Sequence, residues 1–320
     1  MPNLSVAVIA PAEYSKDLGK KGTSSDITLY DVRRGEATVS FIEPTKYPER
    51  LSPLFYACSM SDCALVVVDV VDAMFGECVL MLDAVGLRDG YIVLHNFIPK
   101  EKVAPLIKGT VLESYQFLEE DMVALREMFL EKAERKPSPP ADSGFGSVPI
   151  DHHFNVKGVG TVVLGYVVQG KIHHHGTLHV LPGKKDALVR SIQKHDDDFE
   201  EAETGDRVGL ALKGIDSEEL DRGYVLTNDP TIKCDARILS KARLVRYWQA
   251  PIKEGMVFHI GHWMQFMPAR VVAVDSASDF RTPSLELVLE KELVHSPNSR
   301  AVLTYLDGGK LRIAGTIELP

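Results

Sequence analysis

The sequences DHHFNVKGVGTVVLGYVVQG, residues 151–170, and GDRVGLALKGIDSEELDRGYVL, residues 205–226, decide the fold of the second half of the chain. In both, short apolar runs alternate with Gly, Asn and Asp, which favour turns. Helical periodicity nearly disappears after residue 150, as is typical of small β-barrels. A break near Pro230–Lys233 predicts two all-β barrels, at 150–232 and 233–320.

The first 135 residues have a different pattern, in which apolar runs of strand length alternate with stretches that have apolar residues at helical spacing. The expected strands are 4–10, Thr38–Ile42, Ala64–Val71 and Tyr91–Leu94, and the expected helices are Gly76–Gly86 and Leu118–Ala133. This alternation predicts a doubly wound α/β domain over 1–135. Residues 136–149 contain four prolines, three serines and two glycines, so we expect a linker there.

The composition is that of an ordinary globular protein, with 45% apolar and 25% charged residues in 320. The longest apolar candidate, Ala64–Val71, has the length of a strand, and no run approaches the roughly 20 residues of a membrane helix. The N-terminus lacks the basic and then apolar pattern of a secretory signal. The four cysteines have no paired metal spacing, so we expect reduced thiols in a cytoplasmic protein that does not bind membranes.

The net charge of −9 argues against a protein that coats nucleic acid unspecifically, but the charge is unevenly distributed. Residues 1–150 hold 15 Lys/Arg against 22 Asp/Glu, whereas residues 233–320 hold 12 against 9. The C-terminal part is therefore basic and is expected to be able to approach phosphates.

A phosphate-binding loop of the form Gly-x-x-x-x-Gly-Lys-Ser/Thr is expected directly after the first strand of a nucleotide-binding domain. The matching positions here are Ala10, Ser15, Lys16 and Asp17, of which only the lysine fits. The carboxylate of Asp17 would repel phosphate, although an aspartate can hold magnesium. The segment Lys20–Ser25 offers an alternative anion cradle, but a solvated surface loop is the preferred interpretation.

The two quoted segments resemble the second domain of translation elongation factors of the Tu type, and look closest to the selenocysteine-specific branch, SelB. The resemblance covers nearly the whole chain and is strongest over 150–232. It implies a P-loop-GTPase-like domain followed by two β-barrels. The alternative is that residues 1–135 are another doubly wound domain with an accidental motif register. The C-terminal domain that reads an mRNA hairpin in the selenocysteine branch is expected to be absent from a chain that ends at Pro320.

Two further motifs of that family are degraded. In place of Asp-x-x-Gly-His, residues 43–49 read Glu-Pro-Thr-Lys-Tyr-Pro-Glu. In place of Asn-Lys-x-Asp, residues 94–99 read Leu-His-Asn-Phe-Ile-Pro, which retains only Asn96. The family uses GTP and Mg²⁺, so Lys16, Asp17 and Asn96 mark a vestigial nucleotide site. We expect no catalytic residue, no resident cofactor, and GTP binding and hydrolysis that are weak or lost.

The resemblance implies that Asp151, His152 and Arg207 line an aminoacyl pocket, because acidic, histidine and arginine residues occupy these places in the selenocysteine branch. A carboxylate can accept from the free α-amino group of an aminoacyl ester, and Arg and His can meet a polar side chain. Taken singly, Asp151 is also explained as a turn or cap carboxylate, and Arg207 as a surface ion pair. Gln193 and His195 match the strand that supports the 3′ end of tRNA in the family, although a plain strand surface explains them too.

In the third domain, Ala242–Trp248 is expected to be a strand on which basic and aromatic residues interleave. Arg243 and Arg246 on this strand are expected to contact acceptor-stem phosphates of tRNA. The run His173–His175 suggests a metal site, but strand neighbours point to opposite faces, so we expect no metal there.

The main hypothesis from the sequence is a non-catalytic, SelB-like elongation factor homologue that binds aminoacyl-tRNA and the ribosome as a monomer. A specialised cargo, such as the tRNA that carries pyrrolysine in an archaeal relative, fits this hypothesis. One alternative is an active GTP-dependent elongation factor with divergent motifs. The other is a non-catalytic regulator that binds the ribosome or another protein without tRNA.

Overall fold

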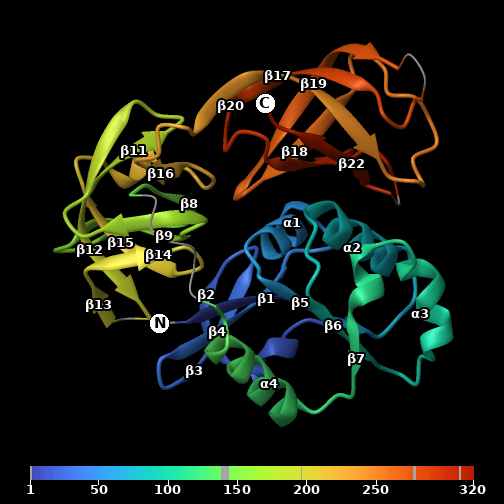
Figure 1. Cartoon of the computed structure of the whole chain (residues 1–320), viewed down its shortest axis with the longest axis horizontal. Helices are drawn as coiled ribbons and strands as arrows, with labels where there is room; N and C mark the ends of the chain where they lie inside the picture. The colour runs from blue at the N-terminus through green and yellow to red at the C-terminus, as the bar shows by residue number, and fades with distance from the viewer. Residues whose placement is uncertain (1, 138–143, 196, 277–278, 310) are drawn as a thin grey trace.

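The protein consists of an α/β domain and two β-barrels (Figure 1). The computed structural model describes residues 2–137, 144–195, 197–276, 279–309 and 311–320. In Figure 1 the α/β domain lies below, the first barrel at the left and the second barrel above α1 and α2. The predicted fold class is therefore confirmed. Residues 138–143 of the expected linker lie outside the described residues, and strand β8 (Gly146–Val156) already begins within the rest of it.

The sheet of the α/β domain has the strand order β2-β3-β4-β1-β5-β6-β7. Its strands are β1 (Asn3–Ile9), β2 (Lys20–Ser24), β3 (Thr28–Arg34), β4 (Ala37–Glu43), β5 (Cys63–Val68), β6 (Gly90–Leu94) and β7 (Gln116–Leu118). The strands from β4 to β7 run parallel, whereas β2 and β3 form an antiparallel hairpin at one edge. All four predicted strands are confirmed as β1, β4, β5 and β6. Both faces of β1 and β5 are buried, as the continuous apolar runs required.

Helices cover both faces of this sheet. They are α1 (Ser52–Ser59), α2 (Ala73–Val85), α3 (Lys100–Ile107) and α4 (Met122–Glu134), with short 3₁₀ helices at η1 (Tyr14–Asp17) and η2 (Val111–Ser114). On the face of α4, Phe129 meets the edges of Phe41 and Tyr91, with ring centroids 5.4 Å apart in each pair. The carboxylates of Asp72 and Asp121 accept from amides of the first turns of α2 and α4, so both helices begin at an Asp cap. None of the described helices is both long and apolar enough to cross a membrane.

The first barrel closes through the strand order β8-β16-β11-β12-β15-β9 and back to β8. The bounds of the other five strands are β9 (Gly160–Tyr166), β11 (Thr177–Leu181), β12 (Lys185–Lys194), β15 (Arg207–Lys213) and β16 (Val225–Thr227). Strands β10 (Gln169–His173), β13 (Asp197–Phe199) and β14 (Glu201–Glu203) extend it, and η3 (Ser217–Glu219) is a 3₁₀ turn. His173 ends β10, and His174 and His175 lie in the turn before β11.

The second barrel closes in the order β17-β20-β19-β18-β21-β22. Its strands are β17 (Lys233–Leu244), β18 (Val257–His262), β19 (Gln265–Asp275), β20 (Ser284–His295), β21 (Arg300–Thr304) and β22 (Ile313–Glu318). The prediction of one strand over Ala242–Trp248 was wrong, because β17 ends at Leu244 and the chain then turns. The turn directs Trp248 into the barrel core beside Phe258.

The α/β domain packs closely on both barrels. Met264, Val302 and Ile313 of the second barrel and Tyr166 of the first belong to the same buried apolar cluster as α1 and α2. Gly261 at the end of β18 is required there, because a Cβ atom would lie 2.7 Å from the ring of Phe55 in α1. These contacts position the edge of the α/β sheet against the first barrel, where the candidate site lies.

Candidate functional site

Asp151 is placed by a β-bulge in β8. Ile150 pairs with Gly165 of β9 and His152 pairs with Leu164, so Asp151 is the extra residue between two consecutive partners. A bulge bends its strand and re-aims a side chain, and here it directs Asp151 inward, where the residue is 1% exposed. Gly165 is needed opposite the bulge, because a Cβ atom would lie 2.4 Å from the carbonyl oxygen of Pro149.

The structure brings Asp151, His152 and Arg207 together. Arg207 Nη1 forms an ion pair with Asp151 Oδ2, and His152 Nδ1 donates to Asp151 Oδ1 at 2.8 Å. Burial raises the pKa of the Asp151 carboxyl, but the charge of Arg207 and the hydrogen bond from His152 outweigh it, so this pKa lies below its ordinary value. Burial lowers the pKa of Arg207, but the charge and the hydrogen bond of Asp151, together with the effects of Tyr166 and Asp31, raise it by more. Both partners are therefore ionised near neutral pH.

One hydrogen-bond donor of Arg207, its Nη2 atom, has no acceptor among the described residues. Its guanidinium lies over the ring of Tyr166, 5.2 Å from the centroid, and its Nη2 atom is buried without a hydrogen-bond partner in the described part of the chain. A buried unsatisfied donor costs about 1–3 kcal/mol, more when it is charged. An acceptor supplied by a ligand would remove this cost.

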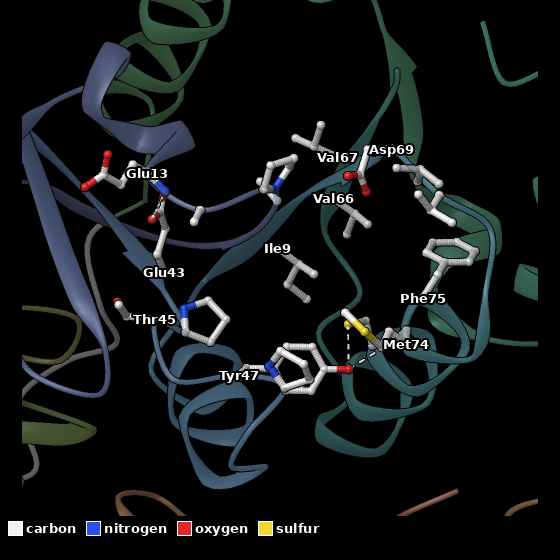
Figure 2. A pocket seen from close by; sticks show the side chains of 18 of the residues that line it. Ile9, Glu13, Glu43, Thr45, Tyr47, Val66, Val67, Asp69, Met74 and Phe75 are labelled. Carbon is white, nitrogen blue, oxygen red and sulfur yellow. Dashed lines mark hydrogen bonds between the residues drawn. The ribbon is translucent and has the colours of Figure 1, made fainter. Parts of the chain in front are cut away.

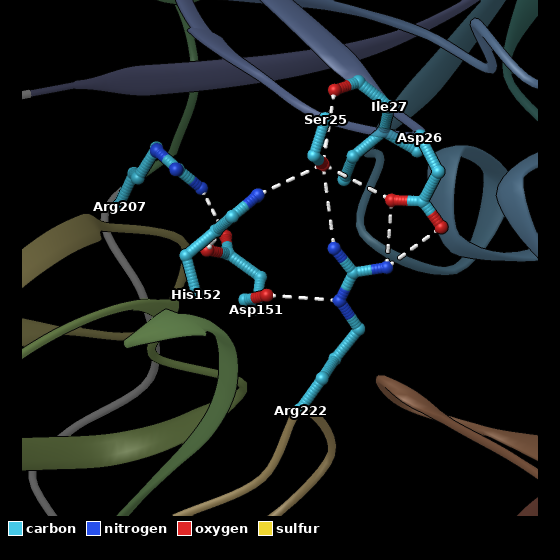
Figure 3. A network of polar contacts seen from close by, with 7 residues as sticks. All are labelled: Ser25, Asp26, Ile27, Asp151, His152, Arg207 and Arg222. Carbon is cyan, nitrogen blue, oxygen red and sulfur yellow. Dashed lines mark hydrogen bonds and ion pairs between the residues drawn. The ribbon is translucent and has the colours of Figure 1, made fainter. Parts of the chain in front are cut away.

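A turn of the α/β domain covers this ion pair (Figure 3). We call residues 25–27, which join β2 to β3, the β2–β3 turn. His152 Nε2 and Ser25 Oγ are hydrogen-bonded at 2.9 Å, and Arg222 Nη1 contacts both carboxylate oxygens of Asp26 at 2.7 and 2.8 Å. Arg222 Nε also donates to the carbonyl oxygen of Asp151 at 2.9 Å. With this turn in place, the side chain of Asp151 is fully buried.

The ion pair between Asp26 and Arg222 stabilises the contact between the β2–β3 turn and the first barrel. Burial raises the pKa of Asp26, but the hydrogen bonds and the charge of Arg222 lower it more, so the net shift is downward. The guanidinium of Arg222 also lies over the ring of Tyr56 in α1, 5.1 Å from its centroid. Sequence reasoning identified neither Asp26 nor Arg222, and interpreted Ser25 as part of a solvated loop. The only available signal was that Arg222 lies within the second segment that decides the fold.

Gln193 lies on the same row of the barrel as His152. The pairs Gln193–Gly209, Gly209–Leu164 and Leu164–His152 are in register across β12, β15, β9 and β8. Gln193 is exposed and donates to Asp198 at 3.0 Å, whereas His195 lies in the turn after β12 with φ of 50°. The row gives Gln193 a common face of the barrel with His152, whereas His195 lies outside it.

Arg243 and Arg246 are both exposed on the second barrel. Arg243 lies on β17 opposite Thr316 of β22. Arg246 lies beyond the end of this strand, over the ring of Tyr247 at 4.6 Å from the centroid. The structure therefore separates the two arginines into a strand and a turn.

The loop after β1 is not shaped to hold phosphate. It leads into η1 and then β2, and its amides already have an anionic partner within the domain. The Glu43 carboxylate, at the end of the neighbouring strand β4, accepts from the amide of Glu13 at 3.2 Å and from that of Ser15 at 2.6 Å. A phosphate loop works by leaving such amides to the ligand. GTP with Mg²⁺ therefore does not fit these residues.

The predicted vestigial residues lie apart from the adjacent cavity. Lys16, Asp17 and Asn96 are exposed, and none of them is in the described lining of the cavity beside β1, β4 and β5. Asn96 donates from Nδ2 to the carbonyl oxygen of Asp69 at 3.0 Å, so it joins the loops after β5 and β6. Within the described residues, no group of three His, Cys, Asp or Glu side chains is placed to hold a metal ion.

Comparison with known proteins identifies the family. Residues 160–227 match the family described as "Elongation factor Tu domain 2". The chain is 38% identical to an uncharacterized protein of Methanocaldococcus jannaschii over 322 positions that cover 100% of both. It is 25% identical over 311 residues to the selenocysteine-specific elongation factor of that organism, covering 89% of this chain and 65% of that protein. The chain thus spans less than two thirds of that factor.

Solved structures show the same fold. The apo form of translation elongation factor SelB from Methanococcus maripaludis aligns with a TM-score of 0.80 and 22% identity, covering 99% of this chain and 79% of that one. The same factor in complex with the GTP analogue GPPNHP aligns with a TM-score of 0.82, 21% identity and the same coverage.

Proposed function

Because the chain belongs to the family of elongation factor Tu and the selenocysteine-specific elongation factor, we propose that it binds a specialised aminoacyl-tRNA through its first barrel without depending on GTP. The observation that carries this proposal is the contrast between the Asp151–Arg207 pair in the first barrel and the loop after β1 in the α/β domain. The buried Asp151–Arg207 pair keeps a guanidinium donor for a ligand, whereas Glu43 already occupies the amides of the loop after β1.

The chemistry of the pair suits an aminoacyl ester. Once the β2–β3 turn has moved, Asp151 can accept from the α-ammonium group, and Arg207 Nη2 can donate to a carbonyl or a polar side chain. His152 is hydrogen-bonded to Asp151 and lies on the same row as Gln193, three strands away, so the row can carry contacts from the amino acid to the terminal nucleotide. The roles of Gln193 and His195 at the 3′ end follow from their place beside this row.

The body of the tRNA would lie along the second barrel. Arg243 and Arg246 are exposed there and can contact acceptor-stem phosphates, which need charge but little geometric precision. The role is one of binding and delivery to the ribosome, with no bond made or broken by the protein. Identification of the tRNA as the one for pyrrolysine, or another unusual amino acid, remains part of the proposal.

The proposal is tested by two measurements on the same preparation. Calorimetric titration with GTP and GDP is expected to show binding far weaker than that of an ordinary elongation factor. Protection of aminoacyl-tRNA from ester hydrolysis, measured over a set of charged tRNAs, is expected for at least one of them without nucleotide. Protection that requires GTP would instead identify an active GTP-dependent factor.

The closed β2–β3 turn favours one second candidate, a regulator that binds the ribosome without tRNA. Its contacts with His152 and Arg222 leave the pocket covered. Co-sedimentation with ribosomes, equal with and without charged tRNA and combined with no ester protection, would support this alternative.

A further inference from the structure

A cavity of about 390 Å³ lies where the carboxyl ends of β1, β4 and β5 meet (Figure 2). Open α/β sheets bind ligands at this edge, and the volume is within the roughly 300–1,000 Å³ of small-molecule sites. Its walls are largely apolar, with Ile9, Val66 and Phe75 turned toward the space and Tyr47 below them in this view. The exposed side chains of Val70 and Met74 also line it.

The charge of the cavity has the wrong sign for a nucleotide. Four carboxylate residues line it, namely Glu13, Glu43, Asp69 and Asp72, and Lys21 is the one cationic side chain in the described lining. Figure 2 shows Glu43 and Asp69 on opposite sides of the space. Glu43 is only 6% exposed, so water screens its charge poorly. The field also acts on Tyr30 in the lining, whose pKa is raised by burial and then by the charges of Glu43 and Glu13.

Two backbone amides of the loop after β1 that could donate to phosphate are also engaged. The two Glu43 oxygens take the amides of Glu13 and Ser15, one each. An ionised carboxylate offers about four acceptor positions, so Glu43 still has acceptor capacity after binding two amides. The site therefore offers acceptors and negative charge, combined with apolar walls.

We propose that this cavity binds a small organic cation with a hydrocarbon body, of the alkylammonium class, in the place where a GTPase holds its nucleotide. The ammonium group is held by the carboxylate of Asp69, and the hydrocarbon body lies against Ile9, Val66 and Phe75. The charge of Glu43, on the opposite side of the space, adds to the field that attracts a cation. A bare metal ion does not fit, because a hard cation requires a convergent set of oxygen ligands, and the described residues provide no such cluster. This inference does not rest on the proposed binding of aminoacyl-tRNA.

A matched pair of ligands tests the sign of the charge. Hexylammonium and hexyl phosphate share one hydrocarbon chain and differ in charge, so calorimetric titration of the full chain with each separates electrostatics from apolar burial. Hexylammonium is expected to bind and hexyl phosphate is not. Shortening the chain to butylammonium is expected to weaken binding about threefold to fourfold per methylene. Hexyl phosphate or GTP binding as tightly as hexylammonium would overturn the proposal.

Variants locate the binding. Asp69→Asn removes an exposed carboxylate, so the variant is expected to fold, and loss of a charge-assisted hydrogen bond should weaken hexylammonium binding about tenfold or more. Lys21→Met removes the opposing charge and should strengthen binding. Lys20→Met, one residue away on the strand and outside the described lining, and Glu36→Gln, in the β3–β4 turn, are the matched controls. Equal affinity in Asp69→Asn and the parent, or equal losses in Asp69→Asn and Glu36→Gln, would show only diffuse attraction to an acidic surface.

Discussion

Two buried carboxylates, Glu43 in the α/β domain and Asp151 in the first barrel, are stabilised by different kinds of contact. Glu43 accepts from two amides of the adjoining loop, so its contacts lie within one domain. Asp151 is paired with Arg207 inside its barrel, but a turn of another domain covers that pair. Contacts within a domain break when the domain unfolds, whereas contacts between domains break when the domains separate. The amides of the loop after β1 are therefore occupied by a contact within the fold itself, whereas the barrel pair is covered by a contact between domains that can open.

The largest effect expected from this comparison is on nucleotide affinity. The loop after β1 has lost several donors to charged phosphate oxygens, each worth about 1.5–3 kcal/mol, so the dissociation constants of GTP and GDP should exceed those of an ordinary elongation factor by orders of magnitude. Isothermal titration calorimetry with and without Mg²⁺ measures them. A submicromolar dissociation constant for either nucleotide would show that the Glu43 carboxylate does not keep the loop amides from phosphate.

The next effect is on stability. Asp151→Asn leaves Arg207 as an unpaired buried charge, and breaking such a pair costs about 3–5 kcal/mol. Denaturant unfolding followed by circular dichroism should show this loss for the transition that includes the first barrel. Glu201→Gln, which breaks the exposed pair between Lys171 and Glu201 in the same barrel, should have a much smaller effect. Equal losses in the free energy of unfolding of the two variants would show that the Asp151–Arg207 pair contributes no more to stability than a surface pair.

The same pair gives a pH dependence with a defined sign. The pKa of Asp151 is lower in the folded protein than its ordinary value of about 3.9, so the pair contributes its full stability above that pH. This contribution is lost as the pH falls through the lower folded pKa. Unfolding measured between about pH 5 and pH 2 should therefore show a smaller pH dependence in Asp151→Asn than in the parent.

A smaller effect is expected on the function of the pocket. Arg207→Ala removes the Nη2 donor, so protection of the aminoacyl ester should fall about tenfold or more, while binding of uncharged tRNA changes little. Arg207→Lys keeps the charge opposite Asp151 but loses the fork, so it should fold like the parent and still protect less well. If charged and uncharged tRNA lose affinity equally, Arg207 is a general phosphate contact or a structural ion pair.

The β2–β3 turn should contribute only modestly to the free energy that keeps the pocket closed. The Asp26–Arg222 pair is partly exposed, so its loss in Asp26→Asn should change the balance between closed and open forms by about 1 kcal/mol, which is several-fold in the rate of binding charged tRNA. Stopped-flow binding measures that rate, with Glu36→Gln as a control on the same domain. Slower or unchanged binding in Asp26→Asn would mean that the β2–β3 turn does not limit access.

The smallest expected effect concerns the second barrel. Arg243→Ala and Arg246→Ala should each flatten the slope of log affinity against log salt by somewhat under one unit, on the guide of about 0.9 per phosphate for duplex DNA. Amino-acid preference should not change, because both arginines are remote in sequence and domain from Asp151. A double variant with the parent's affinity at every salt concentration would remove the second barrel from the tRNA surface.

The sequence by itself determined the elements whose patterns are local. Continuous apolar runs specified β1, β4, β5 and β6, because a strand whose two faces are both buried is apolar at successive positions, and this pattern is visible in the sequence alone. Alternation and turn residues specified the two barrels, and the resemblance to the family motifs grouped Asp151, His152 and Arg207 in one predicted pocket. The β2–β3 hairpin and α3 escaped prediction, because their short and partly exposed segments carry weak periodicity. Helix α1 escaped it because its eight residues are buried almost throughout, so no polar face marks the helical period.

Only the tertiary structure decided what these residues contact. The bulge that buries Asp151 depends on the register between β8 and β9, and the cover depends on Asp26 meeting Arg222, 196 residues away in sequence. The amides of Glu13 and Ser15 are satisfied by Glu43 because β1 and β4 are neighbours in the sheet. Each of these contacts joins segments that are distant in sequence, so no local pattern encodes them. The bulge and the Glu43 contacts form when their own domain folds, and the cover forms only when the α/β domain packs on the first barrel.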